Sequence, residues 1–401
     1  MAKDINPPRG MRDFLPAEKA KRESVLGVIK GVYGSYGFQE VETPALENLD
    51  RLTSGQGGDN EKLAYRVMKR GAELDSALES LESVDVLADL GLRFDLTVPL
   101  TRFYATNRSS LPTVFKAIQM GPVWRAERPQ KGRYRQFVQC DIDIIGDDSV
   151  LAEIELLNAS LAALDALGLS KAVIRVNHRE LLLSLLDSFG VKEADRSSAL
   201  ITLDKLDKIE VTGVVSELRE RLGDGVADKA NTWLLAADKT VPAVLAPLFS
   251  AVDEKRLRFD PTLVRGMGYY TGTIFEIEMP GEGSAIGGGG RYDGMVGKWL
   301  GTDVPAVGIS IGFERVVDLV SAATPTNGVL LVLEDSSIDC IKAAVGFQKE
   351  LIAQGKSVRL ELKPKKLNIL LDSMLEAGFS QFALVSADTS ELNCRAIGNS
   401  T

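Results

Sequence analysis

The sequence predicts an α+β protein, and its length of 401 residues allows two or three domains. Two apolar, strand-like runs at residues 118–124 and 137–145 flank a polar loop at 128–132, a pattern typical of an antiparallel hairpin. Residues 179–251 contain few glycines and carry leucines at helical spacing, so they predict an all-helical module inserted into the surrounding domain. Beyond residue 328, strand-like and helical stretches alternate, which predicts a small α/β domain.

The N-terminal part predicts a helix followed by an interrupted strand. Apolar side chains recur at helical spacing between residues 17 and 36, and Gly37 ends this helix. Residues 38–46 predict a strand that contains Pro44. Because proline is poor inside a sheet, Pro44 indicates an edge, a bend or an interface.

The middle of the chain predicts further elements around the hairpin. Glycines at residues 53–60 predict a mobile loop, and residues 91–97 predict a strand. A helix is expected to follow from Pro99, and another to span residues 150–166. Strand character returns at Leu257 after the helical module.

The closing elements of this domain include a run of four glycines at residues 287–290. Such a run either permits a backbone approach that no side chain would allow, or forms a plain flexible loop. A strand at 273–278 precedes it, and a strand followed by a helix at 306–315 ends the domain. Residues 322–328, with two helix-breaking positions, predict a linker.

The C-terminal domain is predicted in βαβαβ order. The expected strands cover residues 329–333, 357–362 and 382–385, and the expected helices cover residues 338–354 and 367–377.

Composition excludes several kinds of chemistry. The single histidine, His178, rules out a multi-histidine metal site, and its position at a strand end suits capping or packing better than catalysis. Three scattered cysteines form neither a disulfide framework nor a zinc pattern. A net charge of −9 argues against a broadly basic nucleic-acid binder, although a local basic surface stays compatible with it. Without a signal peptide or a membrane-spanning run, we expect a cytoplasmic protein.

The hairpin predicts a ligand site at its mouth. Alternation places Arg125 with Glu127, and Arg133 with Arg135, on shared faces. Guanidinium groups bind phosphate, a carboxylate accepts from an amine or hydroxyl, and the Phe137 ring offers a surface for a base. These groups suit ATP; the alternative is a solvated turn with scattered charge.

Three arginines beside glycines or at strand ends strengthen this interpretation: Arg125, Arg265 and Arg315. A buried arginine without a partner is costly, so each one either pairs with an acid or awaits an anionic ligand. Together they favour a ligand rich in phosphate.

Several motifs resemble those of a known enzyme family. Residues 42–44 (Glu-Thr-Pro), the hairpin around Arg125 and residues 312–315 (Gly-Phe-Glu-Arg) resemble the three signature motifs of class II aminoacyl-tRNA synthetases. Residues 263–272 (Leu-Val-Arg-Gly-Met-Gly-Tyr-Tyr-Thr-Gly) and 289–293 (Gly-Gly-Arg-Tyr-Asp) resemble the two signatures particular to histidyl-tRNA synthetases. The matches span almost the whole chain, with further similarity at residues 8–13, 92–99 and 128–135.

The resemblance implies a class II synthetase-like antiparallel sheet flanked by helices. It places a catalytic domain at residues 1–322, interrupted by the helical insertion at 179–251, and a shortened α/β anticodon-binding-like domain at 329–401. It also implies a homodimer formed through the segment around Pro44.

The implied activity is ATP-dependent activation of L-histidine to histidyl-adenylate, with Mg²⁺ accompanying ATP, and transfer to histidine tRNA. Arg125 would hold the α-phosphate and the substrate carboxylate, and Arg265 would act near the α-phosphate. Glu127 would meet the adenine amine, while Phe137 and Arg315 would cover its two faces. The full implied ATP set is Arg125, Glu127, Arg133, Phe137 and Arg315. The implied histidine set is Asp95, Thr97, Arg125, Gln139, Asp143, Arg265, Tyr269 and Tyr270.

Two features depart from the family pattern. Gly268 stands where the family usually has Asp or Asn, and residues 393–401 do not resemble the usual ending of the anticodon domain. The lysines near residue 365 suit tRNA phosphates or an ordinary solvated helix start. Two alternatives therefore stay open: an inactive, histidine-sensing regulatory subunit of ATP phosphoribosyltransferase, and a synthetase for another amino acid.

Overall fold

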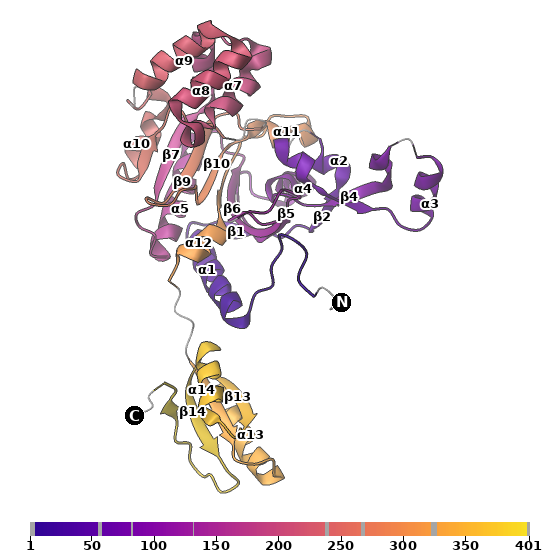
Figure 1. The fold of residues 1–401 in the computed structure, drawn as a ribbon, viewed down its shortest axis with the longest axis vertical. Helices are drawn as coiled ribbons and strands as arrows, with labels where there is room; N and C mark the ends of the chain where they lie inside the picture. Colours follow the sequence, from indigo (N-terminus) through magenta and orange to yellow (C-terminus); the bar gives the residue numbers. More distant parts are fainter. Residues whose placement is uncertain are drawn as a thin grey trace. The chain divides into compact units, whose positions relative to one another are not determined.

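The computed structural model describes residues 5–54, 58–81, 83–130, 132–236, 240–265, 269–321 and 327–398. The chain forms two compact units (Figure 1). The first unit contains residues 1–12 and 26–320, and the second contains residues 13–25 and 321–401. No helix among the described residues is long and apolar enough to cross a membrane.

The first unit is built on an eight-stranded sheet with the order β1-β5-β6-β11-β10-β9-β7-β8. Its strands are β1 (Gln39–Glu40), β5 (Phe115–Trp124), β6 (Gln136–Ile145), β7 (Val173–His178), β8 (Leu257–Phe259), β9 (Thr273–Glu278), β10 (Gly287–Arg291) and β11 (Ala306–Ile311). The pairs β1–β5 and β7–β8 are parallel, and the pairs between them are antiparallel. The predicted α+β class with a mostly antiparallel sheet is confirmed.

The predicted hairpin is the longest pairing in this sheet. β5 and β6 pair continuously from Phe115 opposite Ile145 to Trp124 opposite Gln136. The helix α5 (Val150–Ala166) follows at the predicted residues and packs against β6 and β11. From Cys140 onward every residue of β6 is buried.

Helices and short strands at the N-terminal end differ partly from expectation. α1 (Pro16–Ser35) matches the predicted helix, but the predicted strand at 38–46 is divided between β1 and β2 (Leu46–Asn48), which belong to different sheets. The chain therefore bends around Pro44, one of the roles expected for a proline there.

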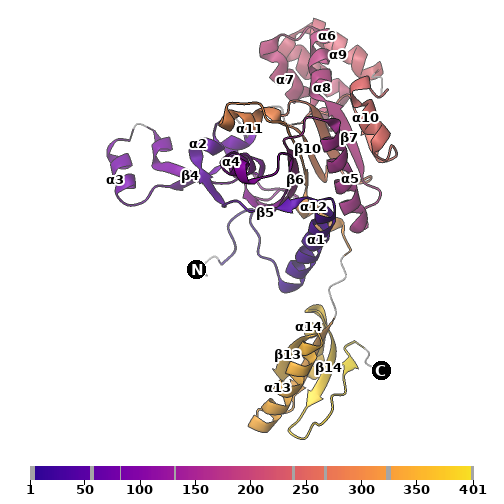
Figure 2. The same ribbon diagram turned by 180° about the vertical axis from the view of Figure 1, so that it is seen from behind.

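A second, three-stranded sheet has the order β2-β4-β3, with β3 (Tyr65–Met68) and β4 (Ala88–Leu92). Short helices accompany it: α2 (Leu49–Leu52), α3 (Ala72–Glu79), and the 3₁₀ turns Gly58–Leu63 and Val84–Leu87. Figure 2 shows that this sheet projects from the rest of the first unit, with α3 at its far end. Residues 55–57 of the predicted mobile loop lie outside the described residues.

The strand predicted at residues 91–97 is wrong beyond Leu92. β4 ends there, and α4 (Thr97–Asn107) begins two residues earlier than expected. The reason is local: the Asp95 carboxylate accepts a hydrogen bond from the Val98 backbone N–H at 3.0 Å, which supports the start of the helix. Leu111 follows a short 3₁₀ turn, Arg108–Ser110, that leads into β5.

The segment 179–251 is helical in the described residues, as the sequence predicts. It contains α6 (Arg179–Phe189), α7 (Arg196–Leu203), α8 (Leu206–Leu222), α9 (Asp224–Ala236) and α10 (Ala246–Ala251), with 3₁₀ turns at Glu193–Asp195 and Ala243–Leu245. Leu186, Phe189 and Leu218 lie in its core, and Leu263 and Val264, outside the segment, pack into the same cluster. The helical insertion therefore shares its hydrophobic core with the segment that leads to Arg265.

The second unit contains a four-stranded sheet with the order β13-β12-β14-β15. Its elements are β12 (Gly328–Leu333), α13 (Ile338–Ala353), β13 (Ser357–Leu362), α14 (Leu367–Glu376), β14 (Phe379–Val385) and β15 (Arg395–Ala396). The βαβαβ order is confirmed, but β15 was not expected. It pairs antiparallel with β14 and lies within residues 393–401, which do not resemble the usual ending of the anticodon domain. Residues 322–326 of the expected linker lie outside the described residues.

The run of four glycines forms the central strand β10, so the flexible-loop alternative is wrong. A Cβ atom on Gly289 would lie 2.0 Å from the Gly308 carbonyl oxygen of β11. A Cβ atom on Gly288 would lie 2.5 Å from Nη1 of Arg265, and one on Gly290 would lie 3.0 Å from the Tyr270 ring. The close backbone approach expected for this glycine run is confirmed, and it lets the side chains of Arg265 and Tyr270 lie directly against β10. The helices α11 (Asp293–Leu300) and α12 (Phe313–Leu319) follow β10 and β11.

We predict that Gly289→Ala destabilises the protein by about 1–3 kcal/mol, because the added methyl group meets backbone that cannot move without breaking the sheet. Urea unfolding of purified variants measures the effect. Gly294→Ala is the matched control, since a Cβ atom there has nothing within 4 Å. Equal stability of the two variants would contradict the steric interpretation of β10.

Candidate active site

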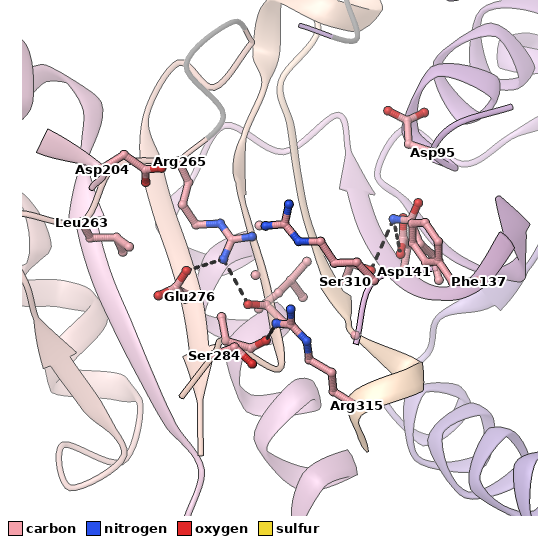
Figure 3. Close-up of a pocket in the computed structure, with 18 of the residues that line it drawn as sticks. Asp95, Phe137, Asp141, Asp204, Leu263, Arg265, Glu276, Ser284, Ser310 and Arg315 are labelled. Carbon is pink, nitrogen blue, oxygen red and sulfur yellow. Dashed lines mark hydrogen bonds and ion pairs between the residues drawn. The ribbon is translucent and has the colours of Figure 1, made fainter. Parts of the chain in front are cut away.

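A cavity of about 840 Å³ opens on the face of the large sheet (Figure 3). Its walls come from β6, β10, β11, the hairpin loop, the start of α12, and the insertion between α7 and α8. Every residue that the resemblance assigns to ATP or histidine lines this one cavity: Asp95, Thr97, Arg125, Glu127, Arg133, Phe137, Gln139, Asp143, Arg265, Tyr269, Tyr270 and Arg315. Gly268 lies outside the described residues.

The three arginines reach the cavity from three different elements. Arg125 donates from Nε to the Phe94 carbonyl oxygen at 2.9 Å, and its guanidinium carbon lies 5.0 Å from the centre of the Phe137 ring. Arg315 donates from Nη1 to the Ala285 carbonyl oxygen. Both partners are neutral, so these hydrogen bonds fix the guanidinium groups without neutralising them.

Arg265 differs because it has an acidic partner. Its Nη1 donates to Glu276 Oε2 at 2.7 Å and to the Gly287 carbonyl oxygen at 3.3 Å. Figure 3 shows Arg265 and Arg315 extending towards one another across the cavity. Burial, then the positive charges of Arg133 and Arg265, lower the pKa of Arg315 from its usual value. These like charges repel one another, so an anion between them would be stabilised.

Arg133 and Arg135 do not share the face predicted for them. Arg133 lines the cavity and donates from Nη1 to Glu127 Oε2 at 3.5 Å. Arg135 instead donates from Nε to the Glu127 carbonyl oxygen at 3.0 Å and from Nη1 to that of Arg9. The alternation rule fails because β6 begins only at Gln136, and Arg133 forms a local bridge with Gln130.

Carboxylates line the end of the cavity near Arg125. Asp141 and Asp143, two residues apart on β6, are buried, as is Asp95 before α4. Tyr292 donates its hydroxyl to Asp143 Oδ1 at 2.6 Å, and Gln139 Nε2 donates to Asp141 Oδ2 at 3.2 Å.

Two buried acceptors at this end lack a hydrogen-bond partner within the described residues: Asp143 Oδ2 and Gln139 Oε1. Both residues line the cavity. Because an unpaired buried acceptor is costly, this end of the cavity is complementary to a ligand that carries N–H donors.

Burial shifts the protonation of these acids. Desolvation raises the pKa of Asp143 to about 7, against the lowering effect of the Tyr292 hydrogen bond. It also raises the pKa of Asp95 to about 6 and that of Asp141 well above its usual value. A cationic or N–H-rich ligand would favour the ionised forms.

Sequence reasoning missed several residues of this site. Asp141 and Tyr292 both contact predicted residues, and Glu276 holds Arg265. Glu276 lies on the strand expected at 273–278, and Asp141 alternates with Asp143, so their positions were available from the pattern. The pairing of Tyr292 with Asp143 was not, because these two residues are 149 positions apart in the sequence.

Other motif residues support the scaffold. Arg291 donates from Nε and Nη2 to the two carboxylate oxygens of Glu153 at 2.7 and 2.6 Å, which ties the end of β10 to the start of α5. His178 accepts from the Glu180 backbone N–H at 3.3 Å, so its expected capping role at the start of α6 is confirmed.

Comparison with known proteins agrees with this geometry. The family model for histidyl-tRNA synthetase matches residues 10–316. The histidine–tRNA ligase of Leifsonia xyli is 52% identical, with 97% of each chain covered. The chain belongs to the histidyl-tRNA synthetase family. A probable histidine–tRNA ligase of Tropheryma whipplei is 42% identical, covering 94% of this chain and 95% of that protein.

Solved structures of this family share the fold. A histidyl-tRNA synthetase from Nostoc sp. PCC 7120 superposes with a TM-score of 0.74 at 25% identity, covering 98% of this chain and 97% of that one. A Bacillus halodurans protein, described as an ATP phosphoribosyltransferase regulatory subunit/histidyl-tRNA synthetase, gives a TM-score of 0.73 at 19% identity, covering 96% and 99%. At that identity it supports the fold alone.

We predict that Asp143→Asn stabilises the ligand-free protein at pH 8 by on the order of 2–4 kcal/mol, with a smaller effect near pH 5. The pKa of Asp143, about 7, lies above its unfolded value, so its stabilising contribution is complete below the unfolded pKa. That contribution is lost as pH rises through 7, where a buried carboxylate must ionise. Asn keeps an acceptor for Tyr292 and removes the charge.

Chemical denaturation across this pH range measures the difference. Asp148→Asn is the control, because that acid follows the same strand and is exposed. A pH-independent difference for Asp143→Asn would contradict the assigned burial of charge.

Proposed function

We propose that this chain is a histidine–tRNA ligase that activates L-histidine with ATP and transfers it to histidine tRNA. The observation that carries the proposal is one cavity lined both by guanidinium groups and by buried acceptors without protein donors. Arg125 lies close enough to Asp95 and Asp141 to affect their pKa values. A nucleotide triphosphate suits the guanidinium groups, and an amino acid with an imidazole side chain and an ammonium group suits the acceptors.

At the nucleotide end, Arg125 would bind the α-phosphate and the histidine carboxylate through its Nη atoms, because its Nε donates to the Phe94 carbonyl oxygen. Phe137 and Arg315 would enclose adenine. Glu127 would contact the adenine amine, and Arg133 would contact the phosphates. Arg265 would stabilise charge that develops at the α-phosphate during adenylate formation.

Mg²⁺ would enter with ATP as part of the substrate. Among the described residues, no group of three or more His, Cys, Asp or Glu side chains is arranged to hold a metal ion. The phosphate oxygens and water would therefore supply much of its coordination, as is usual for Mg²⁺ in nucleotide sites.

At the histidine end, Asp143 Oδ2 and Gln139 Oε1 would accept hydrogen bonds from substrate N–H groups. Asp95 would pair with the ammonium group, and Thr97, Tyr269 and Tyr270 would complete the wall. A competitor without matching donors would leave these buried acceptors unpaired, which provides selectivity.

The alternatives have less support. A histidine-sensing regulatory subunit has no use for the ATP groups, yet Arg125, Arg265 and Arg315 all line this cavity. A synthetase for another amino acid would not require the acceptor arrangement around Asp143.

The larger partners follow from the same proposal. Exposed lysines at the start of α14, Lys363, Lys365 and Lys366, offer a basic surface to tRNA phosphates. We further propose a cytoplasmic homodimer formed around Pro44, where the edge strand β1 leaves backbone groups available for pairing. Arg93 fixes this segment from inside, donating to the Thr43 carbonyl oxygen at 2.6 Å.

We predict histidine-dependent exchange between ATP and pyrophosphate, followed by charging of histidine tRNA with the same preparation. Exchange tests the activation step without tRNA, and charging tests the second unit and the transfer step together. Histidine binding without exchange would favour the regulatory alternative, and exchange with a different amino acid would overturn the proposed specificity.

We predict that Arg265→Ala lowers the exchange rate roughly 100- to 1,000-fold, because a preorganised charge at the reacting phosphate is lost. Folding should change little, since Glu276 keeps Arg175 as a partner at 3.0 Å. Arg219→Ala is the control, because Arg219 lies on the surface of the insertion and pairs with Asp224 and Asp228. Near-normal exchange by Arg265→Ala with unchanged thermal unfolding would contradict the role of Arg265.

A further inference from the structure

The partner of Arg265 belongs to a continuous set of ion pairs. Glu276 binds Arg265 Nη1 through Oε2 at 2.7 Å and Arg175 Nη1 through Oε1 at 3.0 Å. The same Arg175 Nη1 donates to Asp207 Oδ2 at 3.1 Å. These contacts run from α8 of the insertion, through β7 and β9, to Arg265 at the cavity.

Arg175 is the fixed centre of this set. It is 8% exposed, and Asp260 Oδ2 binds its Nε at 2.8 Å and its Nη2 at 2.6 Å. Asp260 in turn accepts from the Thr262 backbone N–H and hydroxyl at the start of the segment that leads to Arg265. The guanidinium plane is therefore held on one side, and Nη1 is left to divide its two protons between Asp207 and Glu276.

Asp207 is the part of the set that can move at low cost. Its side chain is 73% exposed, whereas that of Glu276 is 19% exposed. Glu210, three residues later, interrupts α8 with a φ of 57° and a ψ of 179°. Positive φ is unfavourable for a non-glycine residue, so the first turn of α8 is separated from the rest of the helix by a strained position.

We propose that Asp207 is a positioning residue for Arg265, acting through Arg175 and Glu276, so that the placement of the insertion influences amino-acid activation. This inference rests on the proposed function, and it deepens it by giving the insertion a part in the first step. Asp207 and Arg175 both line the cavity, but the hydrogen bond of Asp207 is to Arg175, so its influence on Arg265 passes through the shared Nη1.

The physical effect is a competition between two carboxylates for one nitrogen. With Asp207 in place, Nη1 gives one proton to each acid, and Glu276 keeps its second oxygen on Arg265. Without the Asp207 charge, Arg175 attracts Glu276 more strongly, and Glu276 is drawn away from Arg265. Arg265 is then less well fixed, which costs stabilisation of the charge that develops at the α-phosphate.

Exchange kinetics test this inference in the full-length chain. We predict that Asp207→Asn lowers kcat for histidine-dependent ATP–pyrophosphate exchange about 5-fold, as is usual for indirect couplings, and changes KM for histidine less than kcat. Asp207→Glu should recover most of the rate, because it restores the charge. Asp228→Asn is the matched control: it removes an exposed acid of the same insertion that pairs with Arg219.

A double-mutant cycle separates positioning from a general structural role. In a Glu276→Gln background the shared acid is already lost, so Asp207→Asn should have no further effect on kcat. Equal losses in both backgrounds, or wild-type kcat for Asp207→Asn, would overturn the inference while leaving the proposed function intact. Absence of exchange by the wild-type chain would overturn both. Thermal unfolding of every variant shows whether a lost rate reflects lost structure.

Discussion

The site depends on a steric constraint: the central strand β10 of the large sheet carries four consecutive glycines and so presents bare backbone to the cavity. Backbone on β10 makes room for the Arg265 guanidinium and the Tyr270 ring. On the neighbouring strand, a Cβ atom at Gly308 would lie 1.9 Å from Asp143 Oδ1. The cationic side chain of Arg265 and the acidic side chain of Asp143 can therefore both lie against the sheet, which forms the floor of the cavity. Any side chain there would displace a group that the proposed chemistry needs.

This arrangement has an energetic cost that a ligand would offset. Burial, followed by the like charges of Arg133 and Arg265, lowers the pKa of Arg315, so its charged form is disfavoured. Burial also holds the pKa values of Asp95 and Asp143 near 6 and 7. A ligand that is anionic at one end and cationic at the other relieves both strains together. ATP bound beside histidine has this distribution of charge, so the same strain that weakens the free protein favours the proposed complex.

The sequence predicts most elements because their signals are local. Alternation and turn composition identify β5 and β6, and helical spacing identifies α5 at its observed bounds. The failures also have physical causes. Asp95 accepts a hydrogen bond from the first turn of a helix where apolar content suggests a strand. Gly287–Gly290 form a strand that propensity cannot reveal, because tertiary packing determines it. The pairing of Glu276 with Arg175 joins residues that are 101 positions apart along the chain, and no spacing rule encodes it.

Burial of the partner acid distinguishes two kinds of arginine in this fold. Arg291 binds Glu153, whose side chain is only 4% exposed, and breaking that pair would leave a buried charge uncompensated, so the contact is a permanent part of the scaffold. Arg175 is as buried as Arg291, but the side chain of its partner Asp207 is 73% exposed. The Asp207 carboxylate is therefore hydrated by solvent when its ion pair with Arg175 breaks. Losing Asp207 therefore costs little, because Asp260 continues to neutralise Arg175. A contact of this kind contributes little to stability and can still alter the field at Arg265, which is what a coupling between the insertion and the active site requires.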